Sequence, residues 1–125
     1  MQADVPLPMT PNTTTVETYM DGFRTLDRPL ILSCLTDDVE WVLPGAFPVP
    51  GTDHFAAHIV DPGFANVPPK IVVHRLIESG DVVVAEGEVQ APKEDGTFLS
   101  LVFCDVFDMR EGKIRRLVSY LMEVK

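Results

Sequence analysis

Residues Thr97 to Val124, TFLSLVFCDVFDMREGKIRRLVSYLMEV, decide the fold of this chain. The segment predicts two long strands joined by a turn at Arg110-Glu111-Gly112-Lys113. Side chains alternate between the two faces of a strand, so every second residue of the first strand shares one face. That face carries Leu99, Leu101, Phe103, Asp105, Phe107 and Met109. Asp105 is the one charged residue in this apolar row, so it must find a partner, shift its pKa or border a cavity.

Two further strands precede this hairpin in the sequence. Residues 71–78 and 82–91 are rich in Val and Ile, and a tight turn at Ser79-Gly80-Asp81 separates them. A second turn at residues 93–96 ends in glycine and leads into the first strand of the C-terminal hairpin. Short connections of this kind predict an antiparallel sheet of four strands. We expect Glu86 and Glu88, which share one strand face, to point into solvent.

The first half of the chain predicts helices. Thr14 and Glu17 have the spacing of a capping box ahead of an amphipathic helix. Asp27 can cap a second, short helix, and a strand follows at residues 39–43. A third helix is expected at residues 53–60, after a loop rich in proline and glycine. Residues 1–12 are proline-rich and offer few anchors, so we expect a flexible N-terminal arm.

This order of elements predicts a single α+β domain over residues 13–125. Its curved antiparallel sheet should pack on about three N-terminal helices, because the helices and the long strands are segregated along the chain. A sheet that curls over helices leaves a cavity at its wide end. We therefore expect the functional site inside that cavity.

Composition restricts the partners and the compartment. The net charge of −9 argues against a nucleic acid or an anionic membrane as a partner. The sequence has neither the pattern of a signal peptide nor an apolar run of transmembrane length, so we expect a cytoplasmic protein. His54 and His58 lie one helical turn apart but have no clear third ligand, so we expect no metal site. Nothing in the sequence requires a cofactor.

The chain resembles the nuclear transport factor 2-like superfamily, and within it the SnoaL-like and ketosteroid-isomerase-like branch. The resemblance covers residues 14–124 and lies in Tyr19, residues 37–41 with Pro44-Gly45, Gly51 with Phe55, residues 103–107, residues 112–114 and residues 119–121. It implies a conical α+β barrel that forms a homodimer through the outer surface of the sheet. Val102, Cys104 and Val106 would suit that interface, because they lie on the face opposite Asp105.

In ketosteroid isomerases a first-helix tyrosine and a strand aspartic acid donate hydrogen bonds to a developing oxyanion, and a separate aspartate is the base. The resemblance matches Tyr19 and Asp105 to the two donors. The base would stand one residue before Pro44, and that residue is Leu43. We therefore reject steroid isomerase as the specific activity.

The sequence nominates two sets of site residues. Asp105, Tyr19 and His74 are the candidates for acid/base catalysis, and an ionised Asp105 would be a general base while a neutral one would stabilise an enolate. The candidates for the apolar wall of the cavity are Trp41, Leu43, Phe55, Phe103, Phe107 and Leu121.

Two functions follow from these residues. One is a cofactor-free isomerase, cyclase or hydrolase that acts by acid/base chemistry on a hydrophobic, carbonyl-type small molecule. The alternative is a non-catalytic ligand-binding or dimerisation module of the same fold, which the leucine at the base position favours. The sequence leaves open whether the protein is an enzyme.

Overall fold

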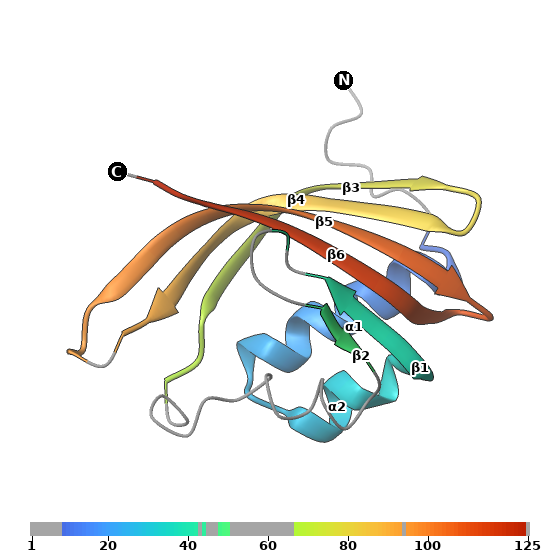
Figure 1. The fold of residues 1–125 in the computed structure, drawn as a ribbon, viewed down its shortest axis with the longest axis horizontal. Coiled ribbons are helices and arrows are strands. Elements are labelled where there is room, and N and C mark those ends of the chain that lie inside the picture. Colours follow the sequence, from blue (N-terminus) through green and yellow to red (C-terminus); the bar gives the residue numbers. More distant parts are fainter. Residues whose placement is uncertain (1–8, 43, 45–47, 51–66, 94, 125) are drawn as a thin grey trace.

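The computed structural model describes residues 9–42, 44, 48–50, 67–93 and 95–124. The elements in these ranges are two helices, α1 (Pro11–Arg24) and α2 (Arg28–Ser33), and the strands β1 (Leu35–Val42), β2 (Pro48–Pro50), β3 (Lys70–Ser79), β4 (Val82–Pro92), β5 (Phe98–Arg110) and β6 (Lys113–Glu123). The strands form one sheet in the order β2-β1-β6-β5-β4-β3. Figure 1 shows that the sheet is curved and open, and that both helices lie under its curve. We call the helix-covered side the inner face and the other side the outer face.

The four long strands follow the sequence prediction. β3, β4, β5 and β6 are antiparallel neighbours, each paired with the next along the chain. Gly80 in the β3–β4 turn has φ 58°, and Glu111 and Gly112 between β5 and β6 have φ 52° and 77°. Two consecutive positive φ angles are the geometry of a tight hairpin turn whose twist matches that of the strands. The hairpin predicted from residues 97–124 is therefore confirmed.

The expectation of a wholly antiparallel sheet is wrong at one pair. β1 runs parallel to β6, since α1 and α2 return the chain to the end of the sheet where β6 begins and Leu35 pairs with Ile114. Glu40 lies beside Arg116 in this ladder, and their side chains form an ion pair of 3.1 Å. β2 pairs antiparallel with β1 and forms the edge of the sheet. The two prolines of β2 are compatible with an edge position, where a missing backbone donor breaks no internal ladder.

The structure corrects the predicted start of one helix and confirms that of the other. α1 begins at Pro11, because Thr10 rather than Thr14 is its N-cap and exchanges side-chain hydrogen bonds with Thr13. Pro11 and Asn12, which the sequence assigned to the N-terminal arm, thus belong to the first turn of α1. Asp27 caps α2 as predicted, by accepting a hydrogen bond from the Leu30 backbone. β1 starts at Leu35, earlier than the predicted residue 39, because its first residue already pairs with β6.

The third predicted helix, residues 53–60, lies outside the described residues. Leu43 and Phe55, two of the predicted cavity residues, lie outside them as well. Neither described helix has the length and apolar character needed to cross a membrane.

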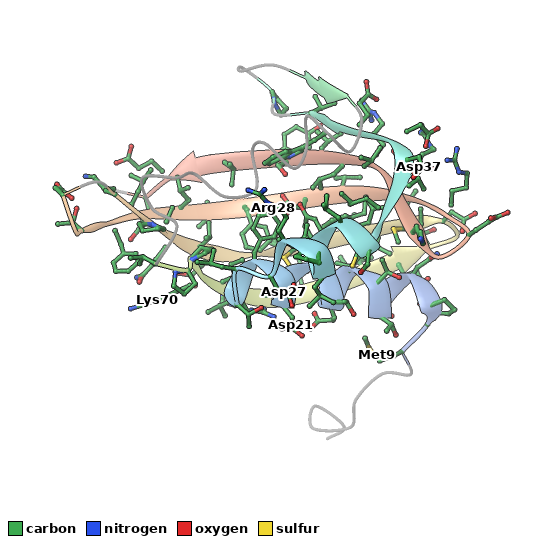
Figure 2. All side chains as sticks on the ribbon, turned by 90° about the horizontal axis from the view of Figure 1, so that it is seen from below. Met9, Asp21, Asp27, Arg28, Asp37 and Lys70 are labelled. Atoms are coloured by element: carbon green, nitrogen blue, oxygen red, sulfur yellow. The ribbon has the colours of Figure 1, made fainter. Side chains whose placement is uncertain are left out.

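The core fills the space between the helices and the inner face. Along β5 the residues Phe103, Asp105, Phe107 and Met109 are buried while their neighbours are more exposed, so the predicted alternation is confirmed. Side chains from both helices complete this core, among them Val16, Tyr19, Met20 and Ile31. Figure 2, from the helix side, shows the helices in front of the strands, with the exposed residues Asp21, Asp27 and Arg28 on them.

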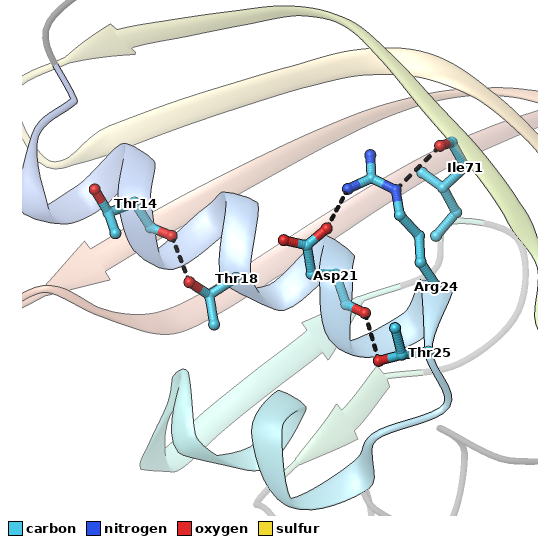
Figure 3. Close-up of polar contacts among 6 residues, drawn as sticks. All are labelled: Thr14, Thr18, Asp21, Arg24, Thr25 and Ile71. Carbon is cyan, nitrogen blue, oxygen red and sulfur yellow. Dashed lines mark hydrogen bonds and ion pairs between the residues drawn. The ribbon is translucent and has the colours of Figure 1, made fainter.

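An arginine on α1 joins the helix layer to the edge strand β3. Arg24 donates from Nε to the backbone oxygen of Ile71 at 3.1 Å and from Nη1 to Asp21 at 2.7 Å (Figure 3). The bond supplies a partner for a carbonyl of an edge strand, whose backbone groups have no further strand to pair with. It also fixes the distance between the end of α1 and the first residues of β3.

Candidate functional site

A cavity of about 150 Å³ lies between the end of α1 and the inner face of the sheet. The residues that line it are Tyr19 and Phe23 from α1, Trp41 from β1, Pro69 and Ile71 at the start of β3, Val89 from β4, Phe103 and Asp105 from β5, and Ser119 and Leu121 from β6. Most of this lining is apolar or aromatic, and the polar groups are few. Such a composition is typical of a site for a hydrophobic small molecule, in which a few polar groups orient the ligand.

Asp105 is the acidic group of the cavity. It is 9% exposed, and burial raises the pKa of its carboxyl from 3.8 to about 7, with a hydrogen bond from Ser119 acting in the opposite direction. The described part of the chain offers its buried Oδ1 no hydrogen-bond partner. A carboxyl with a pKa near neutrality exists in both protonation states at neutral pH, so it can either accept or donate a proton.

Tyr19 places a phenol beside this carboxyl. Burial raises its pKa well above the usual value of 10, and the nearby Asp105 and Cys34 raise it further. Its ring packs edge-to-face on Phe23 and Phe107, with centroid distances of 5.1 Å and 5.6 Å. These contacts fix the ring, and the raised pKa keeps the hydroxyl protonated. Tyr19 is therefore a hydrogen-bond donor at every physiological pH.

Trp41 and Ser119 form a polar contact beside Asp105. The indole Nε1 of Trp41 donates to Oγ of Ser119 at 3.1 Å. Ser119 is 6% exposed and lies directly opposite Asp105 in the β5–β6 ladder. The two strands and the parallel β1 thus bring an indole, a hydroxyl and a carboxyl into one row along the cavity.

The structure brings together most of the residues that the sequence nominated. Asp105, Tyr19, Trp41, Phe103 and Leu121 all line the cavity. Phe107 is fully buried against the Tyr19 ring and supports the cavity without lining it.

His74 is the nominated residue that the structure places elsewhere. It is exposed on the outer face, where its Nε2 lies 2.7 Å from Oε2 of Glu88. Ile71 and Val73 pack against the core, so the alternation along β3 leaves His74 on the solvent side. Glu86 and Glu88 are exposed on the same face, as predicted.

Sequence reasoning missed half of the cavity lining: Phe23, Pro69, Ile71, Val89 and Ser119. Ser119 is the missed residue with chemical capacity. A serine between the apolar residues Leu117 and Leu121 on one face of β6 is the signal that could have marked it.

The outer face carries a larger hollow of about 610 Å³. His74, Glu88, Cys104, Tyr120 and Met122 are among its lining residues. Tyr120 and Met122 are more than half exposed, and the ion pair between His74 and Glu88 is exposed as well. We assign the functional site to the smaller inner cavity, because it holds the buried, perturbed carboxyl that the outer hollow lacks among its described lining.

The inner cavity is suited to proton transfer. Asp105 and Tyr19 are the titratable groups among its described lining residues, and the walls around them are apolar. The part of the chain that the structure describes contains no group of three or more His, Cys, Asp or Glu side chains placed to hold a metal ion.

The family model for the SnoaL-like domain matches residues 16–117 of the chain. Similar solved structures include a nuclear transport factor 2-like protein of unknown function from Burkholderia pseudomallei, which is 22% identical over 91% of this chain and 92% of that chain, with a TM-score of 0.80. TerC, co-crystallised with polyporic acid, is 29% identical over 88% of this chain and 90% of that chain, with a TM-score of 0.75. An LEH-like epoxide hydrolase from M. tuberculosis is 19% identical over 90% and 83% of the two chains, with a TM-score of 0.76. No curated protein matches the sequence.

Proposed function

This chain belongs to the SnoaL-like domain family, and we propose that its inner cavity binds a hydrophobic, carbonyl-type small molecule and performs acid/base chemistry on it without a cofactor. One observation carries the proposal. Asp105, with a pKa of about 7, and a protonated Tyr19 line the same apolar cavity. Enzymes that transfer protons at neutral pH use a base whose pKa lies near the working pH.

The reaction step that we propose is enolisation of the substrate. The ionised Asp105 carboxylate removes a proton from the carbon next to the substrate carbonyl. The electrons of that C–H bond form a C=C bond, and the carbonyl oxygen gains the negative charge. The Tyr19 hydroxyl donates a hydrogen bond to this oxygen, which stabilises the enolate in a cavity of low polarity. Asp105 then returns the proton to the same or another carbon.

Asp105 is assigned as the base because it is the carboxyl that the described cavity residues supply. Leucine occupies position 43, where the resemblance to ketosteroid isomerases places their base. The site therefore differs from theirs: one aspartic acid takes the proton and one tyrosine stabilises the oxyanion.

Similarity to TerC supports a small-molecule ligand. TerC was co-crystallised with polyporic acid, and it is more similar in sequence than the other two structures described above. The epoxide hydrolase supports the fold alone at its lower identity. Polyporic acid is therefore a rational first ligand to test on this chain.

The experiment that tests the proposal measures exchange of the α-protons of 2-tetralone, an enolisable aromatic ketone, in deuterated buffer by NMR. We expect the wild type to accelerate exchange, with a rate that rises with pH around a midpoint near 7. Asp105→Asn should lower the rate by about 10²-fold or more, because it removes the base. Tyr19→Phe should lower it by about 10²–10³-fold, because it removes the oxyanion donor.

His74→Ala is the matched control, since it removes a titratable side chain from the outer face. Its rate should equal that of the wild type. If 2-tetralone or polyporic acid binds the cavity and no exchange is accelerated, the non-catalytic ligand-binding module is correct. If neither compound binds and no exchange occurs, the proposal fails.

We also propose that two copies of the chain pair through their outer faces, as the family resemblance implies. Val72, Val102, Tyr120 and Met122 are exposed apolar or aromatic residues. They come from β3, β5 and β6 and are on the face that the described helices leave uncovered. A second copy would remove this surface from water.

A further inference from the structure

We propose that Ser119, held in turn by the Trp41 indole, is a positioning residue that fixes the Asp105 carboxyl at the wall of the cavity. The consequence of this role for catalysis rests on the proposed function of the inner cavity. The placement of the carboxyl itself can be tested without a ligand.

The β5–β6 register brings the two residues together. The hairpin starts with Arg110 opposite Lys113 and Met109 opposite Ile114. A bulge between Asp108 and Met109 then shifts the pairing by one residue. Without this shift Asp105 would lie opposite Val118, and with it Asp105 lies opposite Ser119. Side chains directly opposite each other in an antiparallel pair are close enough to interact.

Hydrogen-bond chemistry gives the contact a direction. The indole Nε1 of Trp41 is a donor only, so its bond of 3.1 Å occupies a lone pair on Oγ of Ser119. The hydroxyl proton of Ser119 remains available to donate, and a carboxylate oxygen is the strongest acceptor within reach. The Trp41 indole therefore donates to the Ser119 hydroxyl, and the Ser119 hydroxyl donates to the Asp105 carboxyl.

The environment of the Asp105 carboxyl explains why a donor matters there. Oδ1 is buried and has no hydrogen-bond partner among the described residues. An unsatisfied buried acceptor costs free energy, and most when the carboxyl is charged. A hydroxyl donor at Ser119 therefore stabilises the charged form and restrains the orientation of the carboxyl.

The other described groups around Asp105 carry no charge. The residues that share the cavity from β1, β3, β4 and β6 are Trp41, Ile71, Val89, Ser119 and Leu121, and none of them titrates. Ala85 lies opposite Asp105 on β4. Tyr19 on α1 is the described titratable group that interacts with Asp105, and it is uncharged. The Ser119 hydrogen bond opposes the effect of burial on the Asp105 pKa, as expected for a donor to a carboxylate.

The test is a pH titration of the Asp105 side-chain carboxyl carbon, followed by ¹³C NMR in the full chain without ligand. In Ser119→Ala the midpoint should rise by about one pH unit above that of the wild type, because one hydrogen bond to the charged form is lost. Ser119→Thr keeps the hydroxyl and should restore a midpoint near that of the wild type. Trp41→Phe keeps an aromatic ring without the N–H and should shift the midpoint in the same direction as Ser119→Ala, by less.

Ser100→Ala is the matched control, since Ser100 is an exposed serine of β5. It should leave the midpoint unchanged. An unchanged midpoint in Ser119→Ala, or an equal rise in Ser119→Thr, would overturn the positioning role. Such a result leaves the proposed function standing, because ketone exchange is measured separately. Conversely, a shifted midpoint together with no ligand binding would retain the positioning role and remove the function.

Discussion

At the scale of single residues, the described structure places no cation beside Asp105 to relieve its burial. Burial dominates the shift of its pKa to about 7, and a hydrogen bond from Ser119 opposes the shift. Alternation along residues 99–109 predicted both the inward direction of this side chain and its apolar surroundings. The protonation state could not be predicted, because it depends on how deeply the folded chain buries the carboxyl and on a hydrogen bond from another strand.

The raised pKa makes stability depend on pH in a definite direction. Below pH 3.8 Asp105 is protonated in both the folded and the unfolded protein, so its ionisation does not lower the free energy of unfolding there. Between pH 3.8 and about 7 the folded state retains a proton that the unfolded state loses. Stability therefore falls with rising pH across this window and stays at the lower level above it.

Asp105→Asn removes this loss, since an amide does not ionise. We compare the free energies of unfolding of the variant and the wild type at pH 4 and at pH 8. The difference in favour of the variant should be larger at pH 8 by about 2–4 kcal/mol. Urea denaturation at the two pH values measures the difference. Asp37→Asn, at an exposed position of β1, is the control and should show little change between them. A gain for Asp105→Asn that is the same at both pH values would contradict a pKa near 7.

At the scale of secondary structure, the two-residue turn of the C-terminal hairpin was visible in the sequence and the bulge that follows it was not. Counting back from the turn pairs Asp105 with Val118, whereas the bulge pairs it with Ser119. A bulge depends on the packing of the two strands rather than on a local residue signal. The same limit explains why β1 was predicted too short and why its parallel pairing was missed, since both depend on contacts with the distant β6.

The start of α1 offers a direct test of one corrected boundary. Thr10 caps the helix and also donates from its hydroxyl to both carboxylate oxygens of Glu78 at 2.9 Å. Thr10→Ala should therefore lower the free energy of unfolding by about 1–2 kcal/mol. Thr14→Ala is the matched control, because Thr14 is an exposed residue inside the helix and alanine favours helix there. Chemical denaturation of the two variants measures the difference. A larger loss for Thr14→Ala would restore the boundary predicted from the sequence.

At the scale of the whole molecule, the open sheet has two faces with different surroundings. The inner face is covered by α1 and α2, and the outer face is exposed over β3, β5 and β6 (Figure 1). The segregation of helices and strands along the chain was enough to predict this layered α+β fold. It was not enough to show which cavity residues meet, because Phe23, Ile71 and Val89 come from three different elements.

The proposed pairing of outer faces predicts a dimer in solution. A double variant, Val102→Glu with Met122→Glu, would place four added carboxylates in an interface between two chains that each already carry a charge of −9. We expect the dimer to weaken by at least about tenfold, because like charges would lose their hydration and repel each other. Size-exclusion chromatography with light scattering gives the mass. Met9→Glu, also at an exposed residue, is the control. A monomeric wild type, or a double variant that dimerises as well as wild type, rules out this face.

The central claim is that a small molecule binds in the inner cavity beside Asp105. Trp41 is the single tryptophan of the chain and lines that cavity, so its fluorescence reports on this site alone. Titration with polyporic acid or 2-tetralone should change the emission of Trp41 to saturation, beyond the change of free N-acetyltryptophanamide. Val89→Phe, which fills the cavity, should abolish the response, whereas Val72→Phe on the exposed outer side of β3 should retain it. An emission that neither compound changes, or an undiminished response in Val89→Phe, would contradict the account.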